Sequence, residues 1–128
     1  MEPAVLVLIV ENEPAIRNLL QASFEDGGFA VMLASTGEEA LAALDANHGV
    51  RALVADINLD SKLTGWDVAR HGREMNPDLP VVYVTGSEKH DWASLGVPNS
   101  VLIEKPFAPA QVLTAVSQLL NVGNTTGA

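Results

Sequence analysis

Apolar residues are concentrated in five short runs along the chain, with polar and turn-forming residues between them. The first run, Ala4 to Val10, is uninterrupted and consists of aliphatic and β-branched side chains, and a polar segment beginning at Glu11 ends it. A strand that is apolar on both faces belongs in the middle of a parallel sheet covered by helices. We therefore predict five strands, at residues 4–10, 29–34, 52–57, 81–85 and 101–104.

The segments between these runs carry the signals of helices. Pro14 suits the first turn of a helix, where its missing N–H group is no loss, and Gly27 with Gly28 ends that helix. Thr36 followed by Glu39 has the spacing of a capping box, which opens a second helix. Three further helices are expected at about 65–76, 88–95 and 109–120, the middle one weakly patterned.

Strands and helices alternate along the chain. Because parallel neighbouring strands need helical crossovers, five strands alternating with five helices predict a doubly wound α/β domain with a five-stranded parallel sheet. The length of 128 residues fits one such domain. We place the domain at 1–121 and expect residues 122–128, which show no apolar period, to form a flexible C-terminal tail.

Composition narrows the class of protein. Hydrophobic residues make up 48% and charged residues 18% of the chain, which excludes a fully disordered protein. The net charge of −9 repels nucleic-acid phosphates and anionic lipid, so we expect neither nucleic acid nor a membrane as a partner. The sequence contains no cysteine, no basic signal-peptide region and no apolar run long enough to cross a bilayer, so we expect a cytoplasmic protein.

Polar residues with chemical potential stand at the ends of the predicted strands. Ligands of open parallel sheets bind outside the carboxyl ends of the strands, where Glu11, Asn12 and Asp56 should converge. Thr85 and Lys105 should face them from the neighbouring strands. Oxygen ligands of this kind suit Mg²⁺, while a lysine and a threonine hydroxyl suit the oxygens of a transferred phosphoryl group. The pattern predicts a carboxylate that accepts phosphate with the help of a metal ion.

Each feature also has a purely structural interpretation. An acidic strand end can be solvated surface, Lys105 with Pro106 can form a plain turn, and Thr85 can cap the following helix. Asp56 is harder to explain in this way, because a charge at the end of a fully apolar strand needs a partner or water. The coincidence of all these residues at strand ends favours the functional interpretation.

Four fragments at the strand ends resemble the receiver domain of two-component response regulators, the CheY-like type, over residues 4–121. They are Val7–Pro14, Val54–Ile57, Val82–Gly86 and Ile103–Phe107. The resemblance favours a stand-alone, single-domain regulator with a flavodoxin-like fold. It implies a phosphorelay protein that takes a phosphoryl group from a histidine kinase or a histidine phosphotransferase and signals to a downstream protein. It does not imply an enzyme, and it leaves open whether the chain forms a homodimer.

The same resemblance assigns a role to each candidate residue. It implies that Asp56 is the phospho-acceptor, that Thr85 is the switch hydroxyl and that Lys105 contacts the phosphoryl group. It also implies that Mg²⁺ is the cofactor and that a cis peptide bond precedes Pro106. The implied ligands of the metal ion are Glu11, Asn12, Asp56 and the backbone carbonyl of Asn58.

Three departures from the family pattern stand out. Asn12 replaces the second acid that usually follows the first strand, so we expect weakened Mg²⁺ binding. Leu102 replaces an aromatic residue that usually couples the site to the output surface. The loop from Asp56 to Gly65 is one residue longer than usual and has Asp60 where proline is common.

These departures keep a second interpretation open, a pseudo-receiver that serves as a binding module with weak or no metal-dependent phosphorylation. A small-ligand-binding domain of the flavodoxin type is a third alternative. It is weaker, because no phosphate-cradling Gly/Ser loop follows the first strand.

Overall fold

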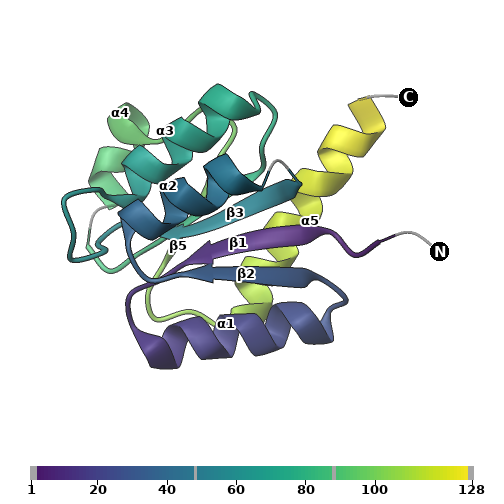
Figure 1. The fold of residues 1–128 in the computed structure, drawn as a ribbon, viewed down its shortest axis with the longest axis horizontal. Helices are drawn as coiled ribbons and strands as arrows, with labels where there is room; N and C mark the ends of the chain where they lie inside the picture. Colours follow the sequence, from purple (N-terminus) through teal and green to yellow (C-terminus); the bar gives the residue numbers. More distant parts are fainter. Residues whose placement is uncertain (1–2, 48, 88, 127–128) are drawn as a thin grey trace.

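The computed structural model describes residues 3–47, 49–87 and 89–126. Its centre is one sheet of five parallel strands in the order β2-β1-β3-β4-β5 (Figure 1). The prediction of a doubly wound α/β fold is confirmed. The strands are β1 (Leu6–Val10), β2 (Ala30–Ala34), β3 (Val50–Asp56), β4 (Val81–Thr85) and β5 (Val101–Glu104).

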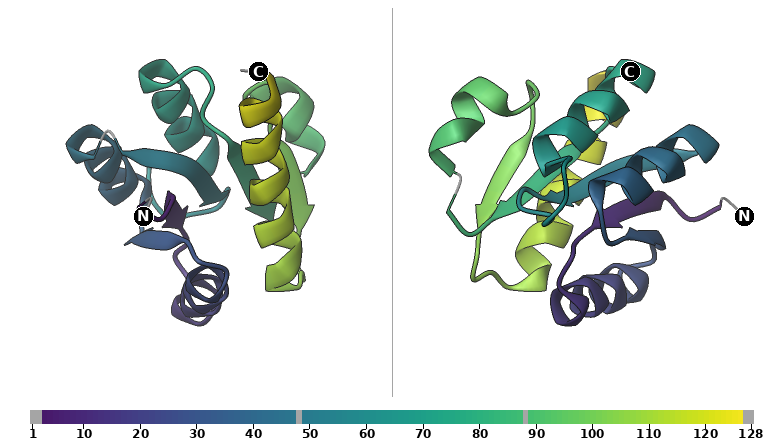
Figure 2. Two further views of the ribbon diagram at one scale, coloured as in Figure 1. Left: turned by 90° about the vertical axis from the view of Figure 1, so that its right-hand side faces the viewer. Right: turned by 60° about the vertical axis from the view of Figure 1, so that its left-hand side comes forward.

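Helices cover both faces of the sheet. Figures 1 and 2 show α1 and α5 on one face and α2 and α3 on the other, with α4 at the outer edge beside β5. Among the described helices, none has the length and apolar character needed to cross a membrane. The helices are α1 (Pro14–Asp26), α2 (Gly37–Ala46), α3 (Gly65–Met75), α4 (Trp92–Leu95) and α5 (Pro109–Thr126).

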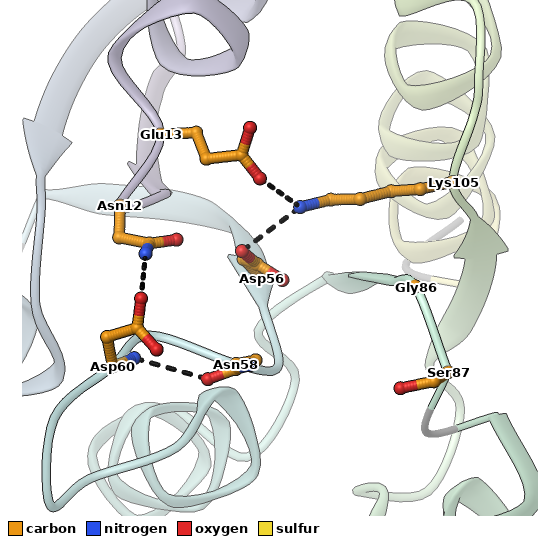
Figure 3. A pocket seen from close by; sticks show the side chains of 8 residues that line it. All are labelled: Asn12, Glu13, Asp56, Asn58, Asp60, Gly86, Ser87 and Lys105. Atoms are coloured by element: carbon orange, nitrogen blue, oxygen red, sulfur yellow. Dashed lines mark hydrogen bonds and ion pairs between the residues drawn. The ribbon is translucent and has the colours of Figure 1, made fainter.

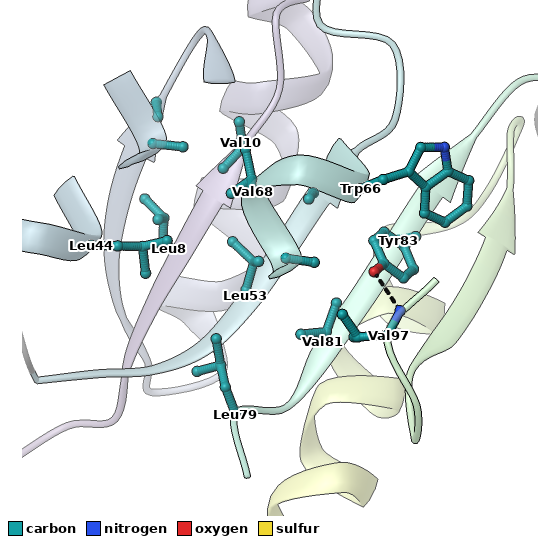
Figure 4. Close-up of a cluster of buried hydrophobic side chains, with 14 of the residues drawn as sticks. Leu8, Val10, Leu44, Leu53, Trp66, Val68, Leu79, Val81, Tyr83 and Val97 are labelled. Atoms are coloured by element: carbon teal, nitrogen blue, oxygen red, sulfur yellow. Dashed lines mark hydrogen bonds between the residues drawn. The ribbon is translucent and has the colours of Figure 1, made fainter. Parts of the chain in front are cut away.

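The central strands are buried on both sides, which explains their uninterrupted apolar sequence. Successive side chains of a strand point to opposite faces, so Leu8 and Val10 enter the cluster beneath α2 and α3 (Figure 4), while Val7 and Ile9 enter the cluster beneath α1 and α5. All four side chains are fully buried. This double packing holds the carboxyl ends of the strands in fixed positions at one edge of the sheet.

The helix boundaries agree with the local sequence signals. Pro14 is the first residue of α1, and the N–H of Gly27 donates to the Ser23 carbonyl at its end. Thr36 caps α2 by accepting from the N–H of Glu39 at 3.1 Å. The Glu39 carboxylate accepts from the N–H of Ser35, one residue earlier than in a standard capping box.

Several strand ends are shifted by one or two residues from the expected boundaries, and two helical segments differ more. The helix expected at 88–95 is a 3₁₀ turn, η1 (Lys89–Asp91), followed by the single turn of α4, and Glu88 lies outside the described residues. Neither segment buries a residue, so packing does not extend its helix. The last helix continues to Thr126, into the segment 122–128 that was expected to be a tail. The expectation ended the helix too early because an apolar pattern marks the packed part of a helix and not its end.

Candidate functional site

A pocket of about 220 Å³ lies at the carboxyl ends of the strands (Figure 3). The strand register brings these ends together, since Val10 pairs with Ala55 and Asp56 pairs with Val84. The pocket is therefore built from the turns that follow β1, β3, β4 and β5. Its lining residues are Asn12, Glu13, Asp56, Asn58, Asp60, Gly86, Ser87 and Lys105.

Asp56 is the last residue of β3 and is 3% exposed. Lys105 directly follows β5, and its ammonium donates to Asp56 Oδ2 at 3.2 Å. Gly65, the first residue of α3, contacts the backbone of Asp56, and a β-carbon at this glycine would overlap the Asp56 carbonyl oxygen. A glycine at this position therefore lets α3 begin directly against the strand that carries the carboxylate.

Glu11 lies behind the pocket rather than in its lining. Its side chain is fully buried, with Oε1 3.4 Å from Lys105 Nζ and Oε2 accepting from the N–H of Glu13 at 3.1 Å. Among the described residues, Glu11 Oε1 has no hydrogen-bond partner. Arg17 on α1 donates to the Glu11 carbonyl oxygen at 3.0 Å and so fixes the turn after β1.

Lys105 is shared among three carboxylates. Besides Asp56 and Glu11, its ammonium lies 3.8 Å from Glu13 Oε1. Burial alone would lower the pKa of this ammonium, but the negative charges of Asp56 and Glu11 outweigh it and raise the Lys105 pKa. The lysine is therefore charged at neutral pH, and its single charge faces an excess of negative charge.

The excess negative charge also acts on Asp56. Burial, followed by the nearby charge of Glu11, raises the pKa of the Asp56 carboxyl from 3.8 to about 7, and Lys105 only partly offsets this. Both causes favour the protonated form of Asp56 relative to that of an exposed carboxyl group. A cation placed in the pocket would favour the ionised form.

Asn12 and Asp60 meet on the side of the pocket that lies opposite Lys105 (Figure 3). Asn12 Nδ2 donates to Asp60 Oδ2 at 2.9 Å, which links the turn after β1 to the loop between β3 and α3. Asn58 lies in the same loop, and its Oδ1 accepts from the N–H of Asp60 at 3.3 Å. Figure 3 shows the three side chains linked in a row by these two hydrogen bonds.

Thr85 ends β4 and is fully buried. Its Oγ1 accepts from the N–H of Ser87 at 3.3 Å, and its carbonyl oxygen accepts from the N–H of Lys105 at 2.7 Å. Gly86 and Ser87, the next two residues, line the pocket, whereas Thr85 does not. The contact of its hydroxyl with a phosphoryl group stays a prediction.

The position at which an aromatic residue was expected is occupied by Leu102 on β5, which is half-buried. It pairs with Tyr83 on β4, whose ring packs against Trp66 at a centroid distance of 4.7 Å. The Tyr83 hydroxyl accepts from the N–H of Val97 at 3.0 Å (Figure 4). The Tyr83 ring on the neighbouring strand therefore contacts Trp66 on α3, and its hydroxyl is hydrogen-bonded to the connection between α4 and β5.

The structure brings together most of the residues predicted from the sequence. Asn12, Asp56, Asn58 and Lys105 line one pocket, and Glu11 lies directly behind it. The cis peptide bond before Pro106 is also present. Sequence reasoning did not assign Glu13, Asp60, Gly86 or Ser87 to the site. Their positions directly after strand ends or in the loop after Asp56 were the available signal.

The donors at this site fit a magnesium ion. Asp56, Asn12 and the loop at Asn58 offer oxygen atoms to the pocket, and the buried Glu11 Oε1 behind it has no hydrogen-bond partner among the described residues. Within the described residues, no three histidine, cysteine, aspartate or glutamate side chains are arranged to hold a metal ion. Mg²⁺ does not need such a cluster, because it commonly keeps several waters and takes only one or two carboxylates.

Comparison with known proteins identifies the family and the fold. Residues 7–117 match the family model of the response regulator receiver domain. The chain belongs to the response regulator receiver family. The crystal structure of a response regulator receiver protein from Sinorhizobium medicae WSM419 is 41% identical, with a TM-score of 0.89, and the match covers 92% of this chain and 95% of that one.

More distant relatives belong to the same family. The response regulator SaeR of Staphylococcus aureus is 28% identical over 116 residues, which are 89% of this chain and 50% of SaeR, so the chain spans half the length of that relative. The response regulator TrrA of Thermotoga maritima, solved in complex with Mg²⁺ and BeF, is 25% identical with a TM-score of 0.77. That match covers 89% of this receiver and 97% of TrrA.

Proposed function

We propose that this receiver accepts a phosphoryl group on Asp56 from the phosphohistidine of a histidine kinase or a phosphotransfer protein. The observation that carries the proposal is the position of Asp56, buried at the end of β3 at a pocket, with the Lys105 ammonium 3.2 Å from its carboxylate. Receiver domains are signalling modules of two-component systems rather than classical enzymes.

The transfer is a substitution at phosphorus. A carboxylate oxygen of ionised Asp56 forms a bond to phosphorus, and the phosphorus–nitrogen bond of the donor histidine breaks with its electron pair returning to the imidazole. Lys105 already lies beside the attacking carboxylate, so its ammonium is placed to pair with the oxygens of the incoming group. Thr85 would contribute its hydroxyl after turning from the N–H of Ser87.

Asp56, Asn12 and the carbonyl of Asn58 would hold Mg²⁺, with Glu11 contributing its charge from behind the pocket. When bound, the ion neutralises charge on the phosphoryl oxygens during transfer. The complex of the similar protein TrrA with Mg²⁺ and BeF supports the proposal that this receiver binds Mg²⁺. The Asn12 amide supplies no formal charge, so we propose weaker binding than at a site with a second carboxylate.

We propose that the phosphorylated form is read by a protein partner, and that the receiver itself acts by docking. A pseudo-receiver is the second candidate function, and the specific observation in its favour is Asn12 in place of an acid. In that case the same fold would bind its partner without metal-dependent phosphorylation.

Incubation with acetyl phosphate and Mg²⁺, followed by intact-mass analysis, separates the two candidates. We expect the wild type to gain the mass of one phosphoryl group and Asp56→Asn to gain none, since the amide is not a nucleophile. Asp78→Asn removes an exposed aspartate at the other end of the sheet and should label as the wild type does. A wild type that stays unlabelled at saturating Mg²⁺ supports the pseudo-receiver.

A further inference from the structure

Asn12 and Asp60 form a pair across the pocket although they are 48 residues apart. Asp60 has a φ of 50°, in the left-handed region, and its N–H donates to Asn58 Oδ1. The turn around Asn58 thus directs the Asp60 side chain back toward the end of β1. Neither residue belongs to a helix or strand, and this hydrogen bond joins the loop after β1 to the loop after β3.

The chemistry of the pair fixes the orientation of the Asn12 side chain. An ionised carboxylate only accepts hydrogen bonds, so the amide must present its NH₂ group to Asp60. The amide oxygen must then point away from Asp60, and Figure 3 shows it directed toward Asp56. An unpaired asparagine has no such constraint, because its oxygen and nitrogen can exchange places by a simple rotation.

We propose that Asp60 is a positioning residue for the metal site, holding the Asn12 amide oxygen toward Asp56 and supplying the negative charge that residue 12 lacks. This inference rests on the proposed function, since it concerns the same Mg²⁺ site. Ligands of metal ions are commonly oriented by a hydrogen bond from a second residue, which also strengthens the ligand atom as a donor. Asn12 and Asp60 together then replace the single acid expected at position 12.

A simpler explanation is that Asp60 attracts cations only through its charge. The two explanations differ in their dependence on Asn12. A carboxylate at position 12 presents an oxygen in either orientation and needs no positioning partner. The positioning role should therefore disappear in an Asn12→Asp background, whereas an effect of charge alone should persist there or increase through repulsion between the two carboxylates.

The test is a double-mutant cycle on the Mg²⁺ dissociation constant, measured by ¹H–¹⁵N NMR titration of the wild type, Asp60→Asn, Asn12→Asp and the double variant. Asparagine tolerates the left-handed conformation of residue 60, so the loop is retained, and the spectra report folding directly. Asp78→Asn is the matched control, with the same loss of one exposed charge before β4.

We expect Asp60→Asn to weaken Mg²⁺ binding by about tenfold in the wild-type background, as for other residues that orient metal ligands. In the Asn12→Asp background the same change should weaken binding by less than about threefold, and Asp78→Asn should have still less effect because solvent and salt screen distant charges. An equal or larger loss in the Asn12→Asp background, or no loss in the wild type, overturns the positioning role. If the wild type shows no saturable Mg²⁺ binding, the metal-dependent function fails and this inference fails with it.

Discussion

Replacing Asn12 by Asp restores the acid that the family pattern expects, and it should destabilise the metal-free protein. In the wild type, the Asn12 amide donates to the Asp60 carboxylate at 2.9 Å. In Asn12→Asp, this hydrogen bond is lost and two carboxylates face each other at the same place. The variant therefore exchanges a favourable contact for a repulsive one, close to the buried charges of Glu11 and Asp56.

The size of this effect follows from the contact distance. Two unit charges 2.9 Å apart repel by about 1.4 kcal/mol in a water-like dielectric. The water-like value applies because Asp60 is exposed and can rotate away. Loss of a hydrogen bond to a charged group adds about 1.5 kcal/mol at the lower end of its range. After relaxation of the exposed side chain we expect a loss of about 2 kcal/mol, or about 7 °C in Tm for a chain of 128 residues.

Thermal unfolding of the wild type and Asn12→Asp in EDTA and in rising Mg²⁺ measures the loss of stability without the metal ion and its recovery when the ion binds. We expect the deficit in Tm of Asn12→Asp to be largest in EDTA and to shrink as Mg²⁺ is added. The ion should bind the folded variant more tightly than the folded wild type, and it therefore stabilises the variant more by mass action. Asn18→Asp makes the same chemical change at an exposed position of α1 and should shift Tm little in either buffer. An Asn12→Asp variant as stable as the wild type in EDTA refutes the reasoning.

Three further predictions follow from the same geometry. Burial holds the pKa of Asp56 at about 7, above its ordinary 3.8, so the folded metal-free protein binds more protons than the unfolded chain. Its unfolding free energy in EDTA should fall as pH rises from about 4 to about 7, and Asp56→Asn should flatten this dependence in urea titrations. Gly65→Ala should lower stability by at least about 2 kcal/mol, because its β-carbon overlaps the Asp56 carbonyl; unchanged urea midpoints would contradict this. Tyr83→Phe leaves the N–H of Val97 without its acceptor and should cost about 1–3 kcal/mol, a prediction that fails if its Tm equals that of the wild type.

The fold and the place of the site could be predicted from the sequence because both depend on burial. The apolar run that ends at Val10 and the run that ends at Asp56 need helices on both faces, and parallel order then brings their carboxyl ends to one edge. Asp56 and Lys105 are close for this topological reason, although 49 residues separate them. No knowledge of loop conformation is needed for that step.

The details of the pocket could not be predicted in this way because they depend on loops. The contact between Asn12 and Asp60 requires the left-handed backbone at Asp60 and the turn at Asn58, which no apolar pattern reports. In the same way, Glu11 follows a buried strand as expected, but its carboxylate turns behind the pocket to Lys105. The sequence places such residues at the right edge and leaves the direction of their side chains open.

In the proposed function, burial of Asp56 bears both on its role as the acceptor and on its need for a cation. A phosphoryl group transferred to a carboxylate that is only 3% exposed would lie next to protein groups rather than in bulk water. The same burial raises its pKa to about 7, and a protonated carboxyl is not a nucleophile. Lys105 cannot correct this alone, because it is shared with Glu11 and Glu13. Added positive charge in the pocket would lower the pKa of Asp56 and favour its ionised, nucleophilic form, so the proposed metal ion and the proposed acceptor are linked through the burial of one carboxylate.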